Sequence, residues 1–135
     1  MASELTMTYR RLAVVTVAVI ACRGVAAEDK ALLPVEARKK VGEKVTVEMT
    51  VRAAKDRLPK RGEIYLDAET DFRDEKNFAV VITRAGAASL KQAGIDNPAD
   101  HYENKKIRAT GTVREVDKVP RIEIDDAKQI KAWFK

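Results

Sequence analysis

The stretch KVTVEMTVR, residues 44–52, decides the fold because its pattern repeats every two positions. Side chains of a β-strand point alternately to opposite faces, so such a repeat predicts a strand with one dry and one wet face. The apolar set is Val45, Val47, Met49 and Val51, and the polar set is Thr46, Glu48, Thr50 and Arg52. The chain around this stretch is therefore expected to be mainly β.

Two further strands follow, EIYLDAE (63–69) and NFAVVIT (77–83). In the first, Tyr65 is predicted to face outward. In the second, Val81 is apolar on the outward side, which predicts a strand covered on both faces. The residues predicted to face the core are Ile64, Leu66, Phe78, Val80 and Ile82.

The segments flanking the first strand carry helix and turn signals. Residues 34–41 predict a short N-terminal helix, because proline suits a first helical turn and Gly42 stands where a helix would end. Residues 53–62, AAKDRLPKRG, predict a loop, since Pro59 and Gly62 are typical turn residues.

A helix and two more strands complete the pattern. Residues 87–93 favour helix before Gly94, and Asn97-Pro98 predicts one further helical turn. KIRATGTVREV (106–116) and RIEID (121–125) return to alternation around the turn DKVP. Three strands, a helix and two strands is the order of a five-stranded OB-fold barrel, in which closure removes exposed edges and the helix plugs one mouth.

The segments EARKKVGEKVTVEMTV, EIYLDAETDFRDEKNFAVVI, KKIRATGTV and PRIEIDDAKQI resemble, in that order, a group of small exported bacterial OB-fold domains related to nucleic-acid-binding OB modules. The likeness covers Pro34 to Ile130. It implies an OB fold, and it implies no single ligand, because OB folds bind oligonucleotides, oligosaccharides, proteins and small ligands. The chain departs from the pattern at Asp126-Ala127, where "DP" is usual, and at Met49, where glycine is common.

Strand order predicts a binding surface on the outer face of strands two and three, between the loop joining strands one and two and the loop joining strands four and five. Cations that track phosphates, together with aromatic rings that stack on bases, suit single-stranded nucleic acid or another polyanion. The predicted ligand-binding residues are Lys55, Arg57, Lys60, Arg61, Tyr65, Lys118 and Arg121. Binding is expected to be weak and of low specificity, and acidic Glu63 and Asp67, which flank Tyr65, are expected to repel phosphate.

Two other kinds of binding module stay open. One binds a small or cationic ligand through the carboxylates of Glu48, Glu63, Asp67 and Glu123. The other is an envelope protein-interaction adaptor. An enzyme is not expected, because the sequence shows no serine elbow, no phosphate-cradling glycine loop and no paired-carboxylate arrangement. No cofactor is expected either.

The acidic run between residues 67 and 75 raises the question of a calcium site. A calcium loop needs a glycine for its sharp turn, and none lies between Asp67 and Asn77. Arg73 and Lys76 lie within the cluster and can neutralise it. The run therefore predicts a solvated loop without a metal, with Phe72 packing back onto the barrel.

Residues 1–27 read as a signal peptide, so the domain is expected to span residues 28–135 and to be exported to the periplasm or beyond. A basic pair precedes the apolar run Leu12–Ala21, and small residues stand before Glu28. A competing reading is a lipoprotein signal, in which Cys22 of VIAC becomes a lipid anchor. The segment holds three of the 26 basic residues and one of the 21 acidic residues, so the remainder carries about +3 rather than +5. The sequence leaves open the role of Trp133 and Phe134 and the oligomeric state.

Overall fold

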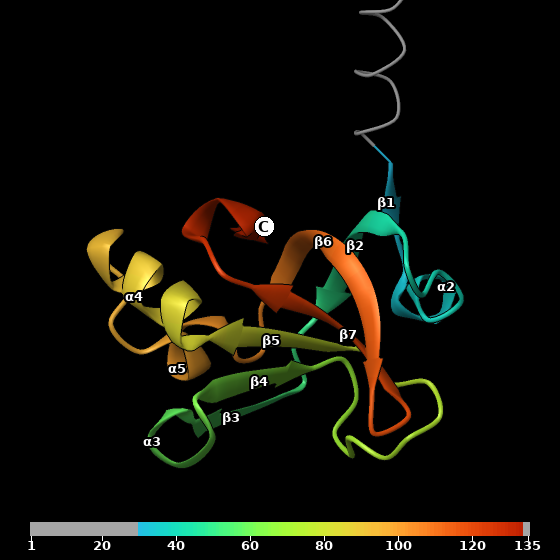
Figure 1. Cartoon of the computed structure of the whole chain (residues 1–135), viewed down its shortest axis with the longest axis horizontal. Helices are drawn as coiled ribbons and strands as arrows, with labels where there is room; N and C mark the ends of the chain where they lie inside the picture. Colours follow the sequence, from blue (N-terminus) through green and yellow to red (C-terminus); the bar gives the residue numbers. More distant parts are fainter. Residues whose placement is uncertain (1–29, 134–135) are drawn as a thin grey trace, which may run out of the picture. The chain divides into compact units, whose positions relative to one another are not determined.

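The computed structural model describes residues 30–133 of the chain. The predicted signal segment, with Cys22, and Phe134 lie outside the described residues. The described part is mainly β, with eight strands in one mixed sheet and a few short helices (Figure 1). The strands are β1 (Ala31–Leu32), β2 (Lys44–Thr50), β3 (Ala53–Arg57), β4 (Glu63–Asp67), β5 (Ala79–Thr83), β6 (Lys106–Val116), β7 (Val119–Ile124) and β8 (Ile130–Trp133). The helices are α2 (Pro34–Ala37), α3 (Leu58–Arg61), α4 (Arg84–Gln92), α5 (Pro98–Tyr102) and the 3-10 turn η2 (Ala127–Gln129).

The strands are hydrogen-bonded in the order β1-β2-β6-β7-β5-β4-β3, and β8 also pairs with β6. Pairing is parallel between β1 and β2 and between β5 and β7, and antiparallel elsewhere. Although β2 and β3 lie far apart on this path, only Val51 and Arg52 separate them along the chain. The Val51 amide donates to the Lys105 carbonyl and the Arg52 amide donates to the Asp67 carbonyl, both at 2.9 Å. The backbone therefore changes its hydrogen-bond partner at this point: Val51 bonds to the segment before β6, and Arg52 bonds to β4.

The alternating pattern predicts the core correctly. All five residues predicted to face inward from residues 63–83 are at most 1% exposed, and Val81 on the opposite face is also fully buried. The strong burial of β5 follows from its central place, since it pairs with β4 on one side and with β7 on the other. This is the environment that a strand apolar on both faces indicates.

The prediction of a loop over residues 53–62 is wrong. Residues 53–57 form β3, which pairs along its whole length with β4, and residues 58–61 form the helical turn α3. Pro59 stands in the first turn of α3, and Gly62 ends it in the left-handed conformation, with φ 75°. Pro59 and Gly62 therefore mark the start and the end of a helical turn. The residues before them form a strand, because β4 supplies partners for their backbone hydrogen bonds.

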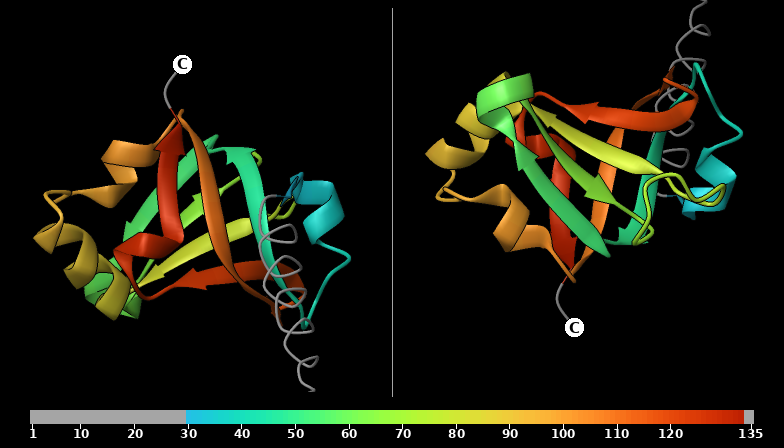
Figure 2. Two further views of the ribbon diagram at one scale, coloured as in Figure 1. Left: turned by 90° about the horizontal axis from the view of Figure 1, so that it is seen from above. Right: turned by 90° about the horizontal axis from the view of Figure 1, so that it is seen from below.

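The helical insertion between the third and fourth predicted strands is confirmed as α4 and α5. The Thr83 side chain accepts from the Gly86 amide at the start of α4, and the Asn97 side chain accepts from the Asp100 amide at the start of α5. Gly86 is buried against β7, and a Cβ there would overlap the carbonyl oxygen of Ile124. The two helices lie at the opposite end of the sheet from α2 (Figures 1 and 2).

Both ends of the described chain differ from expectation. The N-terminal helix is shorter than predicted: α2 covers Pro34–Ala37 alone, and Val41, the last residue of the predicted helix, is 49% exposed. The C-terminal segment forms β8, paired with β6 from Lys106 to Ala109. None of the helices in the described part of the chain is long and apolar enough to cross a membrane.

Candidate functional site

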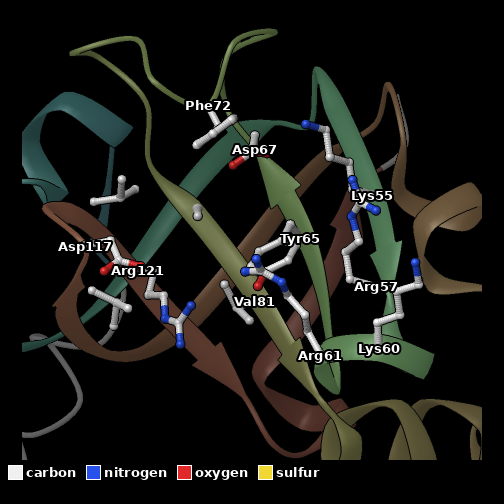
Figure 3. A pocket seen from close by; sticks show the side chains of 13 residues that line it. Lys55, Arg57, Lys60, Arg61, Tyr65, Asp67, Phe72, Val81, Asp117 and Arg121 are labelled. Carbon is white, nitrogen blue, oxygen red and sulfur yellow. The ribbon is translucent and has the colours of Figure 1, made fainter.

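A groove of about 480 Å³ lies on the outer face of β3, β4 and β5, with the β6–β7 hairpin along its other side (Figure 3). Of the seven predicted ligand-binding residues, six line it, and Lys118 does not. The six are Lys55, Arg57, Lys60, Arg61, Tyr65 and Arg121, and the remaining lining residues are Asp67, Phe72, Ala79, Val81, Val116, Asp117 and Val119. The described part of β8 pairs with β6 and contributes no residue to the groove.

The strand register explains why these side chains meet. Tyr65 on β4 stands opposite Lys55 on β3 and opposite Val81 on β5. Directly opposed residues of an antiparallel pair project to the same face of a sheet. The neighbouring residues Ile64 and Leu66 therefore point into the core, and their burial anchors the strand that presents Tyr65.

One rim of the groove is cationic. Lys55 and Arg57 come from β3, and Lys60 and Arg61 come from α3; all four are exposed. Among residues 30–133, Arg57 and Lys60 form no salt bridge within 4.0 Å. Within the described part of the chain, the charges of Arg57 and Lys60 are therefore not paired with a carboxylate, which is what an anionic ligand requires.

Two aromatic rings accompany the cationic rim. Tyr65 lies at the centre of the groove, and Phe72 lies above it on the β4–β5 loop (Figure 3). Phe72 is 47% exposed, so the prediction that it packs back onto the barrel is wrong. Instead, the ring lies near two cations: Lys55 Nζ is 5.1 Å and Arg73 Cζ is 5.6 Å from its centroid. Both rings line the groove, Tyr65 half-buried and Phe72 exposed.

Arg121 lines the groove, but it is not a free cation. Its Nη2 lies 3.0 Å from Glu63 Oε2 and 2.8 Å from Glu123 Oε2, and its side chain is only 12% exposed. Arg114 contacts the same Glu123 at 3.0 Å, and the Tyr65 hydroxyl donates to Glu63 Oε1 at 2.6 Å. These five side chains form a polar network across β4, β7 and β6. The expected repulsion between Glu63 and phosphate is weakened, because the Glu63 carboxylate is paired with the Arg121 guanidinium.

The network also fixes the state of the tyrosine. Burial, and then the hydrogen bond to Glu63, raise the pKa of the Tyr65 hydroxyl, while the nearby Arg61 acts in the opposite direction. Tyr65 therefore remains a neutral ring that donates its proton to a carboxylate. Its orientation is set by the protein before any ligand arrives.

A buried polar pair supports the loop that carries Phe72. Asp67 is 3% exposed and Asn77 is fully buried, and Asn77 Nδ2 donates to Asp67 Oδ1 at 3.1 Å. Burial raises the pKa of the Asp67 carboxyl, against the opposing effects of Asn77 and Lys55. Asn77 also donates to the Phe72 carbonyl at 3.3 Å and accepts from the Glu69 amide at 3.0 Å. Sequence reasoning missed this role of Asn77; a single polar residue directly before a buried apolar strand was the available signal.

The acidic loop uses its carboxylates on its own backbone. Asp71 Oδ1 accepts from the Arg73 amide at 2.9 Å, and Asp74 Oδ1 accepts from the Lys76 amide at 2.8 Å. Between residues 30 and 133, no three His, Cys, Asp or Glu side chains are arranged to hold a metal ion.

The four carboxylates of the alternative cationic-ligand site do not form one open acidic surface. Glu48 belongs to β2 and pairs with Arg108 at 3.3 Å and with Lys106 at 3.6 Å. Glu63 and Glu123 hold Arg121, and Asp67 is bonded to Asn77. A cationic ligand would have to displace an internal partner at almost every one of these positions.

No protein-family model and no curated protein matches this chain. Solved structures do match. Over 78% of this chain, asparaginyl-tRNA synthetase from Pyrococcus horikoshii is similar, with 13% identity and a TM-score of 0.51. Aspartyl-tRNA synthetase from Entamoeba histolytica is similar over 82% of this chain, with 14% identity and a TM-score of 0.50.

The chain spans less than a quarter of each of these proteins, 23% and 22% of their lengths, and identity at this level concerns the fold alone. With the strand order, the matches support an OB-like, mainly β fold for the described residues. The OB-like part of the resemblance found in the sequence agrees with them, and export stays a prediction.

Proposed function

We propose that this protein is a binding module, not an enzyme, and that it holds single-stranded nucleic acid in the groove on the outer face of β3, β4 and β5. The observation that carries the proposal is the placement of Arg57 and Lys60, which form no salt bridge among the described residues, in one groove with half-buried Tyr65 and exposed Phe72. The phosphates of a strand supply negative charges that pair with the cationic rim, and every base has a face that stacks on an aromatic ring.

The shape of the groove supports the same ligand. Its lining includes the buried apolar side chains of Ala79 and Val81, 5% and 0% exposed, between the cationic rim and the valines of the β6–β7 hairpin. A strand lying along the rim would direct its bases over these side chains and its backbone toward solvent and the cations. The structural neighbours are, by name, tRNA synthetases, which agrees with a nucleic-acid ligand class.

The proposal includes the finer architecture. We infer that β2 and β3 act as one bent strand, so that this strand with β4, β5, β6 and β7 makes a five-stranded barrel. Its support is the two-residue connection at Val51 and Arg52, where the backbone partner changes without a loop. A bent first strand of this kind brings the cationic rim directly next to the strand that carries Tyr65.

The test is fluorescence anisotropy with a labelled single-stranded oligo-dT at low salt. The double variant Lys60→Ala/Arg61→Ala should weaken binding about tenfold and lower the slope of log affinity against log salt by about 2. The matched control, Lys39→Ala/Lys40→Ala, removes the same charge from exposed positions outside the groove and should have a small effect. Absence of binding by the folded wild-type protein at low salt excludes the proposal.

Export is a separate proposal with its own support, the basic pair and apolar run of residues 10–21. Mass spectrometry of the protein purified from its natural source should give Glu28 as the first residue, or a lipidated Cys22 in the alternative. An intact Met1 would contradict both.

A further inference from the structure

Several of the hydrogen-bond donors at the base of the groove are already in use. Arg121 Nη2 is held by Glu63 and Glu123, and the Tyr65 hydroxyl donates to Glu63. Arg121 Nε has no partner among residues 30–133, but it is enclosed and exposes no surface to a ligand. The backbone amides of Ala79 and Val81 belong to a strand that is paired on both sides. A base over this floor meets few free donors.

Two acceptors remain. Asp67 Oδ1 accepts from Asn77, while Asp67 Oδ2 receives no hydrogen bond from the described residues. Asp117, in the turn of the β6–β7 hairpin, is exposed and lines the groove from the other side. Its side chain forms no salt bridge within the described part of the chain. In Figure 3 Asp67 lies beside Phe72, and Asp117 lies across the groove beside Arg121.

Carboxylates in an anion-binding groove oppose phosphate, so their useful role is toward the bases. The amino groups of cytosine and adenine are donors, whereas thymine presents the O4 acceptor at the corresponding position. A carboxylate accepts from the first two and repels the third. Building on the proposed function, we infer that Asp67 and Asp117 make the groove select bases that carry an amino group, cytosine above all, over thymine and uracil.

The selection is measurable as a ratio of affinities. Using the full chain and labelled strands of about ten nucleotides, oligo-dC should bind about fivefold more tightly than oligo-dT. Asp67→Asn should remove or invert this ratio, because the new amide keeps the acceptor for Asn77 and can turn an N–H toward thymine O4. Asp117→Asn should reduce the ratio as well.

Loss of a negative charge strengthens phosphate binding to every strand, so the dC/dT ratio is the readout rather than either affinity. Asp96→Asn is the matched control: it removes the same charge from an exposed position outside the groove and should leave the ratio unchanged. Asp117 is exposed, so its variant remains informative even if Asp67→Asn fails to fold. Equal binding of both strands by the wild type overturns this inference and leaves the proposed function standing. No binding of either strand overturns both.

Discussion

Two outer walls of the same sheet differ in how their polar side chains are partnered. On the β2–β6 wall, Thr46 Oγ1 and Thr110 Oγ1 are 2.8 Å apart, and Glu48 contacts both Arg108 and Lys106. On the β3–β5 wall, Arg57 and Lys60 form no salt bridge among the described residues, and they line a groove with Tyr65 and Phe72. The strands β2 and β4 of the two walls share the same alternation of apolar and polar residues. The comparison teaches that alternation locates the outer face, while the state of its polar pairs distinguishes a closed surface from a binding surface.

The largest effect is expected from a change at the tight contact between α4 and β7. Gly86→Ala would force a Cβ into the carbonyl of Ile124 and push α4 away from β7. Overpacking of this kind destabilises by about 3 kcal/mol, measured by chemical denaturation. The control Ala85→Gly, at an exposed position of the same helix, should lose less than about 1 kcal/mol. Equal losses for the two variants would show that the helix–strand contact is not tight.

A second change breaks the β3–β5 wall alone. Arg121→Ala leaves Glu63 and Glu123 half-buried without their shared cation. We expect a loss of about 2 kcal/mol in the free energy of unfolding, together with weaker oligonucleotide binding, since Glu63 then loses its ion pair with Arg121 and Glu123 keeps only the one with Arg114. Urea denaturation and anisotropy on the same preparations check both effects. An increase in affinity would mean that Arg121 blocks the groove rather than shaping it.

A pH series sharpens the comparison at one buried group. Burial raises the pKa of Asp67, so the folded state favours the protonated carboxyl. The contribution of this group to stability is therefore present at low pH and is lost as pH rises through its folded pKa. Asp67→Asn should be more stable than the wild type at pH 7, and the difference should shrink as pH falls toward the ordinary aspartate range. Thermal melts across pH 3–8 measure it; a difference that grows on acidification contradicts the assignment.

The smallest effect is expected on the closed wall. In the double variant Thr46→Val/Thr110→Val, both partners of one hydrogen bond become apolar groups of the same shape. Such paired replacement is nearly neutral, within about 0.5 kcal/mol, and oligonucleotide binding should not change. A marked loss of binding would indicate that the ligand contacts the β2–β6 wall, and it would contradict the assignment of the binding surface to the β3–β5 wall.

Sequence reasoning predicted the faces of β2, β4 and β5 because apolar side chains every two residues have one stable arrangement in a sheet. It missed β3 because residues 53–57 carry no such repeat; their strand exists through pairing with β4. The candidate site shows the same limit. The cations could be named from the predicted loops, but the pairing of Arg121 could not, since Glu63 lies 58 residues away and meets it only across β5.

The side-chain network from Arg114 to Tyr65 has a consequence for the entropy of binding. Glu123, Arg121 and Glu63 connect three strands, and the ring of Tyr65 loses its rotational freedom when the chain folds. A nucleobase that docks on this ring meets a surface already set, so little further ordering entropy opposes the encounter. We therefore expect a nucleobase to bind a preformed surface on this wall, with little rearrangement of the protein.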